Sequence, residues 1–501
     1  MNQNKYLLYI NGKFQEGFSK EWLEVINPAD ESIIALAAKG MIEDAEAAVV
    51  AASEAFENRS WSGLTVQERS AILLKVAQKM TEGQEELLSL IIKDSGATRF
   101  KAKAEVALAI GTIKYYAELI RTPYQYEAVS PAANGRQSSY NFIQREPIGV
   151  CAGIVPWNFP LSLGMWKIAP ALAAGNTVVI KAPSEAPLAL LAFAKFADAA
   201  GVPKGVLNIL AGSGRVIGEY LAEHPKVDKI SFTGSTAVGK RIMTLAANSN
   251  LKITTLELGG KSANIILEDA DLDAAIDGSL FATLLHSGQV CESGTRLLVP
   301  QSRYEEILVR LAERAKNIKI GDPSKNDVGM GPVISRKQKE KIEEYIQTGL
   351  QEGARIILGQ EKLEGEQYQK GFWVPPTIFA DVHNDMTIAR EEIFGPVLSV
   401  IPYQTEAEAV KIANDSIYGL GGGVWSQDKG HAIEVAQQLR TGTVWVNSYH
   451  VMNPNTPFGG YKQSGLGREM GVPGLLAYTQ SKHIHVDLGN GNKDRYKWLL
   501  G

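Results

Sequence analysis

The chain has 501 residues, of which 45% are hydrophobic and 21% are charged, a composition typical of globular proteins. Its 51 Lys and Arg residues against 55 Asp and Glu residues give a net charge of -4, which offers no electrostatic argument for binding nucleic acid or a membrane surface. A chain of this length exceeds what one hydrophobic core can organise, so two or three domains are expected.

The chain contains two cysteines, Cys151 and Cys291, which are far apart in the sequence. Two thiols in so long a chain argue against a disulfide framework and indicate a reducing compartment. The N-terminal segment lacks the basic start and apolar core of a signal peptide, and no apolar run approaches the ~20 residues of a membrane helix. We expect a cytoplasmic protein that binds neither nucleic acid nor membranes.

Residues 41–122 are predicted to be mainly helical, because apolar residues recur there at three- and four-residue spacing. Residues 124–147 break this pattern with a proline, an Asn-Gly turn and an alternating strand. The resulting hairpin has no helix to cover it and one face to bury, so a second subunit is a candidate partner.

From residue 176 onward, strands alternate with helices. Strands are predicted at 176–182, 205–210, 229–233 and 253–258, and helices at 187–201, 214–224 and 235–248. After Cys291 a second series follows, with strands at 296–300, 396–403 and 441–448 and helices at 303–318 and 406–415. Such alternation implies parallel sheets, so we expect two α/β domains that face a shared cleft.

Two glycine-rich turns are candidate phosphate sites. In "SFTGSTAVGKR", residues 231–241, a strand runs through a glycine turn into a helix, whose free N–H groups attract phosphate. Arg241 replaces the hydroxyl that would bind Mg²⁺ in a P-loop, and Ile217 replaces the last glycine of a dinucleotide fingerprint in "GSGRVIG". An ordinary strand-to-helix turn remains the alternative for either stretch.

Two further motifs hold polar groups suited to catalysis. Glu257 ends an apolar strand in "LELGGKS", where a carboxylate with a raised pKa could act as a general base, although a capping or ion-paired role is the alternative. Asn158 lies between two aromatic residues in "IVPWNFP", where its amide could donate to an oxyanion, or simply belong to a structural turn.

Cys291 lies in the polar, glycine-rich stretch "HSGQVCESGTR", which is unusual for a cysteine used only in packing. Small neighbours would let a substrate reach a nucleophilic thiolate there. His286, five residues earlier, raises a Cys–His protease hypothesis, but nearness in sequence does not make a catalytic pair. Cys151 has apolar neighbours and is predicted to be a buried, inert thiol.

Taken together, "PWNFP", "LELGGKS", "GQVCESGTR", "EEIFGPV" and "PFGGYKQSG" resemble the aldehyde dehydrogenase superfamily, in the family's order and over nearly the whole chain. The resemblance implies a three-domain α/β fold. A Rossmann-type NAD(P)-binding domain would comprise residues 1–123 and 148–257, an α/β catalytic domain residues 258–472, and a small β oligomerisation domain residues 124–147 and 473–501. It also implies a homodimer or homotetramer.

The resemblance further implies NAD(P)⁺-dependent oxidation of an aldehyde to its acid through a thiohemiacetal and a thioester on Cys291. Asn158 and the Cys291 backbone N–H would form the oxyanion hole, and Glu257 would activate water. No metal is implied. The residues expected to bind the cofactor are Ile154, Pro156, Trp157, Lys181, Ser184, Glu185, Gly234, Ser235, Gly239, Leu258, Gly259, Glu392 and Phe394.

Three positions depart from the family pattern. Ser184 occupies the usual place of a ribose-binding glutamate, with Glu185 one residue later. A carboxylate repels a 2′-phosphate, so Glu185 favours NAD, while Ser184 keeps NADP open. Gln480 stands where many relatives have a glutamate proposed to relay protons, which leaves Glu257 as the sole expected base. Glu292 places a charge beside the nucleophile, where many relatives have a small residue.

The positions that match the family's substrate tunnel are Phe159, Trp166, Leu285, His450 and Met452. This mainly apolar and aromatic set favours an aliphatic or aromatic aldehyde over a dicarboxylic semialdehyde, which would need a basic clamp. Betaine aldehyde stays open because aromatic rings can hold a quaternary ammonium. A CoA-acylating enzyme and a non-catalytic binding protein are alternatives; Glu257 argues against the first, and the retained catalytic set against the second.

Overall fold

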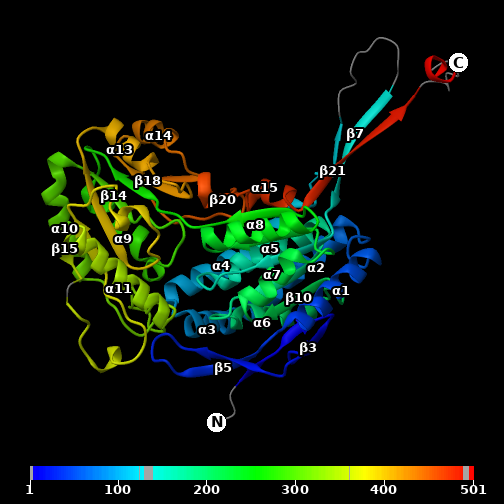
Figure 1. Cartoon of the computed structure of the whole chain (residues 1–501), viewed down its shortest axis with the longest axis horizontal. Coiled ribbons are helices and arrows are strands. Elements are labelled where there is room, and N and C mark those ends of the chain that lie inside the picture. The colour runs from blue at the N-terminus through cyan, green and yellow to red at the C-terminus, as the bar shows by residue number, and fades with distance from the viewer. Residues whose placement is uncertain (1–3, 123, 129–138, 360, 489–495) are drawn as a thin grey trace.

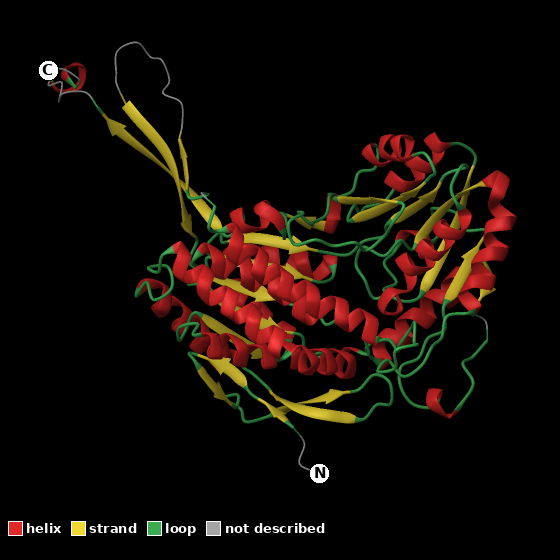
Figure 2. Ribbon diagram, turned by 180° about the vertical axis from the view of Figure 1, so that it is seen from behind, coloured by secondary structure: helices red, strands yellow, loops and turns green. Residues whose placement is uncertain are grey.

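The computed structural model describes residues 4–122, 124–128, 139–359, 361–488 and 496–501. Within them the strands form four sheets, and helices cover the two larger sheets, which lie side by side (Figures 1 and 2). The two large, mainly parallel sheets and one small antiparallel sheet confirm the α/β fold class expected from the sequence.

The first large sheet has the strand order β20-β12-β11-β8-β9-β10-β2-β3. Its five central strands are parallel: β8 (Val150–Ile154), β9 (Thr177–Ala182), β10 (Leu207–Ala211), β11 (Lys229–Thr233) and β12 (Ile253–Glu257). Because the strand order reverses between β8 and β11, the loops that follow them diverge and leave a crevice, where open α/β sheets bind ligands. Antiparallel partners extend its edges: β20 (Gly465–Leu466), β2 (Leu8–Ile10) and β3 (Lys13–Gln15).

Helices cover both faces of this sheet (Figure 1). The helical prediction for residues 41–122 is confirmed by α1 (Ile42–Glu57), α2 (Val66–Glu82), α3 (Gln84–Ser95) and α4 (Arg99–Leu119). Between the strands lie α5 (Pro160–Ala174), α6 (Leu188–Ala200), α7 (Glu219–Glu223) and α8 (Thr236–Ser249), with a π-helical turn at Gly214–Gly218 before α7. As predicted, α6 ends at Gly201, whose φ of +92° suits a residue without a Cβ.

The second large sheet has the order β15-β16-β17-β14-β13-β18-β19 and is parallel except for β15. Its strands are β13 (Ala263–Ile266), β14 (Arg296–Pro300), β15 (Arg355–Leu358), β16 (Thr377–Ala380), β17 (Val397–Tyr403), β18 (Gly421–Trp425) and β19 (Thr443–Val446). The accompanying helices are α9 (Leu272–Leu284), α10 (Tyr304–Lys316), α11 (Arg336–Gln351), α12 (Thr387–Arg390), α13 (Glu406–Asn414) and α14 (Lys429–Gln437).

The predicted strands and helices of this second series are confirmed, but β18 was missed because its sequence "GGGVW" has little intrinsic preference for a strand. Close packing explains the glycines: a Cβ at Gly423 would lie 2.4 Å from Asn264 Oδ1. Tertiary contacts therefore decide the conformation of this segment.

A third sheet, of β6 (Tyr126–Ala128), β7 (Ser139–Pro147) and β21 (Thr479–Asp487), projects from the body as an arm (Figure 1). β6 and β7 pair antiparallel, as the hairpin prediction requires, although the expected Asn-Gly turn lies outside the described residues. β21 was not predicted, yet it pairs with β7 along nine residues.

The remaining elements are β1 (Lys5–Tyr6), β4 (Trp22–Ile26) and β5 (Ile33–Ala38), which form a fourth sheet, and the short helices α15 (Gly471–Leu476) and α16 (Lys497–Leu500). β20 pairs with the first sheet although it lies within residues 258–472, so the exact domain boundaries stay a prediction. In the described ranges we find no helix with the length and hydropathy needed to cross a bilayer.

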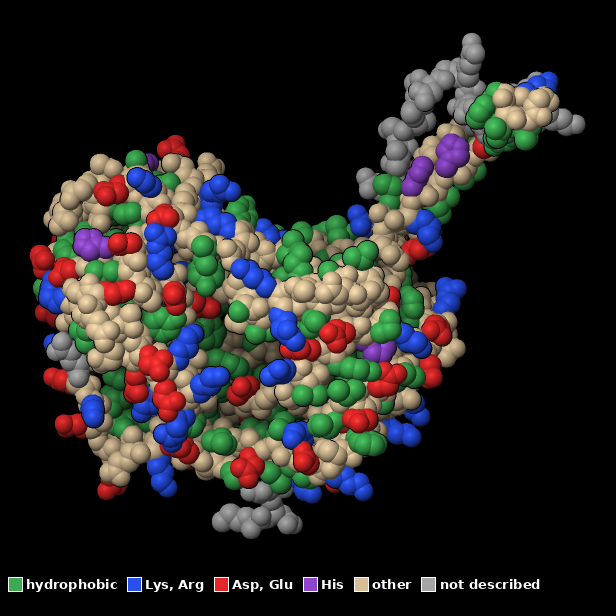
Figure 3. Space-filling view, viewed as in Figure 1, with side chains coloured by type: hydrophobic (Ala, Val, Ile, Leu, Met, Phe, Trp, Pro, Cys, Tyr) green, Lys and Arg blue, Asp and Glu red, His purple; other side chains and the backbone are tan. Residues whose placement is uncertain are grey.

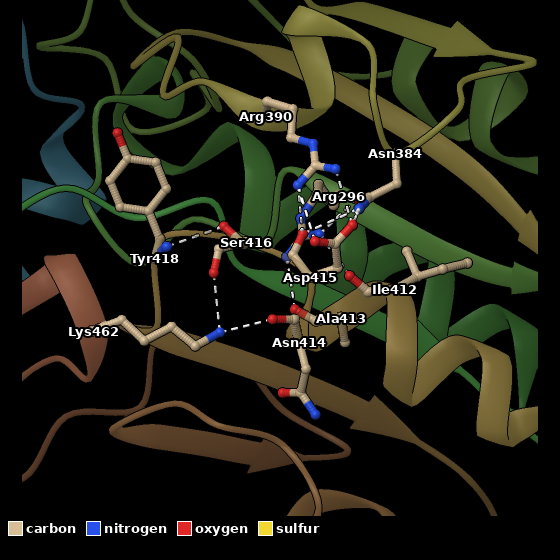
Figure 4. A network of polar contacts seen from close by, with 10 residues as sticks. All are labelled: Arg296, Asn384, Arg390, Ile412, Ala413, Asn414, Asp415, Ser416, Tyr418 and Lys462. Atoms are coloured by element: carbon tan, nitrogen blue, oxygen red, sulfur yellow. Dashed lines mark hydrogen bonds and ion pairs between the residues drawn. The ribbon is translucent and has the colours of Figure 1, made fainter.

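A buried guanidinium anchors the start of β14 (Figure 4). Arg296 donates from Nε to Lys261 O at 2.9 Å and from Nη1 to Asn384 Oδ1 at 2.8 Å. It also donates to two carbonyls at the end of α13, Ile412 O at 2.9 Å and Ala413 O at 3.0 Å. Because Arg296 lies five residues beyond Cys291, this network fixes the end of the cysteine loop.

We expect Arg296→Lys to lower the thermal unfolding midpoint by several degrees. An ammonium cannot reproduce the planar fork, so at least one buried carbonyl loses its donor, at a cost of roughly 1–3 kcal/mol. Calorimetry would measure the shift, with Arg310→Lys on exposed α10 as the matched control. Equal midpoints for both variants would show that the buried network does not stabilise the fold.

Candidate active site

A cavity of about 190 Å³ opens at the crevice between β8 and β11, where the first sheet faces the second domain. Figure 3 shows that the surface is hollowed between the part of the molecule built on the first sheet and the part built on the second. The walls of the cavity are formed by Pro156, Trp157, Asn158, Thr233, Gly234, Ser235, Glu257, Leu258, Gly259, Cys291, Gln338, Lys341, Glu392 and Phe394. Many residues singled out from separate motifs thus meet at one place.

Cys291 lies half-buried in the loop before β14 and lines this cavity. Its thiol donates to Glu292 Oε2 across 3.2 Å. Burial raises the pKa of the Cys291 thiol well above its usual value, and the carboxylates of Glu292, Glu392 and Glu257 raise it further. The resting group is therefore a protonated thiol that needs an acceptor for its proton before it can attack.

Cys151 and His286, the other two residues considered for thiol chemistry, do not line this cavity. Cys151 is buried in β8, where burial raises its thiol pKa to about 12, as expected for an inert cysteine. His286 packs edge-on against Phe159, with ring centroids 5.8 Å apart, and neither of its nitrogens has a hydrogen-bond partner among the described residues. His286 is thus not paired with Cys291, which argues against the protease hypothesis.

Asn158 is held at the edge of the cavity by a buried ion pair. Its side-chain Nδ2 donates to Gln289 O at 2.9 Å, and its backbone carbonyl accepts from Lys101 Nζ at 2.6 Å. Lys101 also donates to Glu105 Oε2 at 2.6 Å, and Glu105 Oε1 accepts the Leu161 backbone N–H at 2.8 Å. The pair was missed from the sequence, because nothing in the pattern of α4 separates it from the solvent-exposed charges of that helix.

Glu257 ends β12 with a side chain that is almost fully buried, and neither carboxylate oxygen has a hydrogen-bond partner among the described residues. Burial raises the pKa of Glu257 well above its usual value, and the Glu469 carboxylate raises it further, against the opposing charges of Lys167 and Arg468. A carboxylate that titrates so high, beside a thiol, has the properties of a general base near neutral pH.

The prediction that Gln480 occupies a proton-relay position beside Glu257 is wrong. Gln480 lies exposed on β21, opposite Glu146, and does not line the cavity. The second carboxylate near Glu257 is Glu469, whose Oε1 accepts from Lys167 Nζ at 2.6 Å and from the hydroxyl of Ser231 at 2.7 Å. The local motif could not reveal this, since Glu469 reaches the site from eleven residues upstream of Gln480.

The start of α8 forms one wall of the cavity. Ser235 is the N-cap of this helix, but its side chain caps no N–H group, so the first turn keeps free donors suited to phosphate. A Cβ at Gly239 would lie 2.4 Å from Leu258 Cδ2, so glycine allows α8 to pack closely on the chain that follows β12.

The opposite wall holds the half-buried carboxylate of Glu392 and an aromatic pair. Glu392 Oε1 accepts the Gly260 N–H at 3.2 Å, and burial raises the pKa of Glu392 to about 7. A Cβ at Gly259 would lie 2.3 Å from Glu392 Oε2, so any larger residue there would displace this carboxylate. Trp157 meets Phe394 edge to face, with centroids 5.3 Å apart.

Two residues of α11, Gln338 and Lys341, complete this wall and were missed from the sequence. Gln338 Nε2 donates to Phe394 O at 2.8 Å, and Lys341 Nζ donates to Glu392 O at 3.2 Å. These bonds hold Phe394 at a φ of +59°, a conformation that residues with a side chain rarely adopt. In the sequence, Gln338 and Lys341 belong to a polar helix face, and such faces are common on protein surfaces.

The remaining residues expected to bind the cofactor, Lys181, Ser184 and Glu185, lie at the end of β9 and just after it. Lys181 ends β9 beside Ile154 of β8, and burial lowers the pKa of Lys181 to about 8. Its Nζ lies 3.5 Å from Ser184 Oγ, and the Ser184 hydroxyl donates to Gly212 O at 2.8 Å. Glu185 is exposed to solvent. Ser184 is therefore the hydrogen-bonding neighbour of Lys181, while the charge of Glu185 acts on it without a direct contact.

The five substrate candidates are not brought into one cavity. Trp166 packs on Phe458, with centroids 5.3 Å apart, and Met452 lines a second cavity that also contains Phe458. Phe159 covers Lys101 Nζ at 4.1 Å, and Leu285 lines a third cavity with other apolar residues. The fifth, His450, is hydrogen-bonded to Glu292 at 3.0 Å. Their roles toward a substrate stay predictions.

The fold and the cavity define the class: an α/β enzyme with a nucleotide-type crevice and a cysteine among buried carboxylates. No group of His, Cys, Asp and Glu side chains in the described parts of the chain is arranged to hold a metal. The sequence model of the aldehyde dehydrogenase family matches residues 14–484.

Two curated relatives illustrate the similarity. The chain is 43% identical over 478 residues to betaine aldehyde dehydrogenase of Bacillus subtilis (strain 168), which covers 95% of this chain and 96% of that protein. It is 41% identical over 483 residues to aldehyde dehydrogenase of Davidiella tassiana, which covers 96% and 95%.

Two solved structures agree. Betaine aldehyde dehydrogenase from Staphylococcus aureus in complex with NAD⁺ matches with a TM-score of 0.95 and 39% identity, over 99% of this chain and 97% of that chain. The NAD⁺ complex of Bacillus cereus aldehyde dehydrogenase matches with a TM-score of 0.93 and 40% identity, over 97% of each. The chain belongs to the aldehyde dehydrogenase family and is an oxidoreductase that acts on aldehydes.

We expect Lys101→Met to reduce both stability and kcat. Removing one partner of a buried ion pair costs about 3–5 kcal/mol, and the Asn158 carbonyl loses the donor that fixes it. The double variant Lys101→Met/Glu105→Gln should recover most of the lost thermal midpoint but not kcat. No buried charge is left unpaired in it and an amide oxygen can still accept the Leu161 N–H, while the Asn158 backbone carbonyl still lacks its donor. Full recovery of kcat in the double variant would show that the pair does not position Asn158.

Proposed function

We propose that this protein oxidises an aliphatic or aromatic aldehyde to its carboxylic acid with NAD⁺, through a thiohemiacetal and a thioester on Cys291. One observation carries the proposal: Cys291, Asn158 and Glu257, from three distant segments, line a single cavity at the switch point of the first sheet. This cavity offers a nucleophile, an oxyanion donor and a base to one small molecule.

In the first step the Cys291 sulfur bonds to the aldehyde carbon and the carbonyl oxygen becomes an oxyanion. The Asn158 amide and the Cys291 backbone N–H are the donors proposed to stabilise that charge. Lys101 fixes the backbone carbonyl of Asn158 and Gln289 O accepts from its Nδ2, so the side-chain amide is held in place before the substrate arrives. Preorganisation of this kind lowers the barrier because no reorientation is needed during the reaction.

The residues at the switch point fit a dinucleotide. The free N–H groups at the start of α8 suit a pyrophosphate, Lys181 and Ser184 lie where an adenosine ribose would reach, and Glu392 and Phe394 form the wall expected at the nicotinamide end. When bound, the nicotinamide supplies the hydride acceptor. Ile154, Pro156, Trp157, Leu258, Gly259 and Gly239 are proposed to shape the remaining surface.

The preference for NAD⁺ over NADP⁺ is a proposal. Glu185 is exposed rather than paired with Lys181, so its repulsion of a 2′-phosphate acts through solvent and is weak. NADP⁺ stays an alternative for this reason. Two of the relatives with solved structures are described in complex with NAD⁺, which supports the preference.

Glu257 is the proposed base for hydrolysis of the thioester. Its unpartnered, buried oxygens are free to accept a proton from water, and only the ionised form can do so. Because its pKa is raised, the ionised form is lost as the pH falls, and deacylation slows well before the pH at which an exposed glutamate would protonate.

A second substrate candidate is betaine aldehyde. Trp166 packs against Phe458, and aromatic faces of this kind attract a quaternary ammonium. Relatives named betaine aldehyde dehydrogenase are 39–43% identical to the chain. The cavity that contains Met452 and Phe458 has no Lys or Arg in its wall, which argues against a dicarboxylic semialdehyde.

We propose a homodimer or homotetramer in the cytoplasm. The arm of β6, β7 and β21 projects from the body, and most side chains of β21 are exposed in the single chain. A sheet with both faces in water is unstable alone, so a second copy is the expected partner. Two unpaired cysteines fit a reducing compartment.

A panel of aldehydes offered with NAD⁺ and NADP⁺ in parallel tests the proposal through the absorbance of the reduced cofactor. We expect turnover without CoA, faster with NAD⁺, and best with apolar or aromatic aldehydes. Cys291→Ser should abolish turnover while NAD⁺ still binds, because the hydroxyl is a far weaker nucleophile. Turnover in Cys291→Ser would remove Cys291 from the mechanism, and preference for betaine aldehyde would favour the second candidate.

Glu257→Gln should stall the enzyme at the thioester, because an amide cannot take a proton from water. Mass spectrometry of the intact protein after a single turnover should show the added acyl group on Cys291. In the wild type, the deacylation rate should fall as the pH drops through the raised pKa of Glu257. An unchanged steady-state rate in Glu257→Gln would exclude it as the base.

A further inference from the structure

Glu292 is a buried carboxylate that the proposed function leaves without a role. It follows the nucleophile directly, and only about 8% of its side chain is exposed. Oε2 accepts the Cys291 thiol at 3.2 Å, and Oε1 lies 3.0 Å from His450 Nδ1. One carboxylate therefore joins the reacting sulfur to a histidine from a segment about 160 residues away.

His450 is held rigidly in place. Its Nε2 lies 3.0 Å from Ala282 O at the inner face of α9, and its backbone φ of +58° is one that histidine rarely adopts. Three aromatic rings surround it: Phe281 at 5.5 Å, Tyr449 at 4.9 Å and Trp445 at 6.3 Å between centroids. These three rings confine the imidazole beside Glu292.

The hydrogen-bond partners of His450 fix the number of protons that the His450–Glu292 pair carries. A carbonyl oxygen only accepts, so Nε2 of His450 carries a hydrogen that it donates to Ala282 O. One further proton lies between Nδ1 and Glu292 Oε1, since neither a bare carboxylate nor a bare nitrogen can donate. The His450–Glu292 pair thus shares one proton between Nδ1 and Oε1, which leaves Oε2 as an acceptor for the thiol.

We propose that Glu292 is the general base that accepts the thiol proton of Cys291 as the Cys291 sulfur attacks the aldehyde. His450 positions Glu292 for this step and keeps its carboxylate ionised. The inference rests on Cys291 being the nucleophile, as proposed above. Glu292 touches the reacting sulfur and is a catalytic residue in this scheme, whereas His450 acts through it and is a positioning residue.

The step balances without a further reagent. The Cys291 sulfur forms a bond to the aldehyde carbon, the carbonyl π pair moves to oxygen as an alkoxide near Asn158, and the S–H proton passes to Glu292 Oε2. When the alkoxide collapses to the thioester, its hydride passes to the NAD⁺ of the proposed reaction, and Glu292 releases that proton to water. The net proton is the one that aldehyde oxidation must release.

The charges around the pair support this order of events. Glu257 and Glu392 also face the sulfur, and Tyr449 donates its hydroxyl to the Glu292 backbone carbonyl at 2.9 Å. The three carboxylates raise the pKa of the thiol, so a free thiolate is scarce at rest. His450 instead lowers the pKa of Glu292 despite burial, which keeps its carboxylate ionised and ready to accept.

The test is the pH dependence of kcat/KM in Glu292→Gln, with Glu434→Gln on exposed α14 as the matched control. We expect kcat/KM to fall at least about tenfold at pH 7 and the deficit to shrink as the pH rises, because thiolate then forms without a base. The alkylation of Cys291 by iodoacetamide, followed by mass spectrometry, should shift to lower pH, since a neighbouring negative charge has been removed.

His450→Gln should move the acidic limb of kcat/KM to higher pH, because Glu292 loses the group that favours its ionised form. Glu292→Asp should keep the wild-type shape of the profile at a lower kcat/KM, since a carboxylate remains but reaches less far. A deficit in Glu292→Gln that is equal at every pH would mean structural damage and overturn the proposal, as would a profile equal to that of Glu434→Gln.

NAD⁺ binding followed by tryptophan fluorescence verifies that each variant is folded. The outcomes separate this inference from the proposed function. Turnover in Cys291→Ser would remove the nucleophile and with it both proposals. Loss of turnover in Cys291→Ser combined with an unaltered Glu292→Gln profile would refute the role of Glu292 alone.

Discussion

The reversal of strand order between β8 and β11 is the constraint on which the site depends. Backbone loops that leave two adjacent parallel strands in opposite directions cannot pack on each other, so a crevice remains at their carboxyl ends. Asn158 follows β8, Ser235 follows β11, and Glu257 ends β12, so all three reach the same edge. The second domain then closes this edge with the Cys291 loop.

Burial of several carboxylates around one thiol is the second organising feature. Glu257, Glu292 and Glu469 are buried and Glu392 is half-buried, and three of the four have a partner that stabilises the carboxylate. Glu469 has Lys167 as an ion-pair partner, Glu292 has His450, and Glu392 has a backbone N–H. Glu257 has no hydrogen-bond partner among the residues that the structure describes, so a bound substrate or water can change its pKa more than that of the other three.

Strained backbone conformations lie near these side chains. Phe394, His450 and His286 all have positive φ values, which cost of order 1–3 kcal/mol each in residues with a side chain. Hydrogen bonds within the second domain, such as those from Gln338 to the Phe394 segment, offset this strain. The strain sets the direction of side chains that an unstrained loop would point elsewhere.

The sequence alone determined the alternation of strands and helices, the end of α6 at Gly201, the helical region of residues 41–122 and the motifs around Asn158, Glu257 and Cys291. These features depend on local patterns of hydrophobicity and glycine, which neighbouring residues impose. The tertiary structure alone decided the pairings across the chain: Lys101 with Asn158, Glu469 near Glu257, His450 with Glu292, and β21 with β7. These contacts join residues 57 or more positions apart, so no local pattern encodes them, and they exist only because folding brings distant segments within reach of one another.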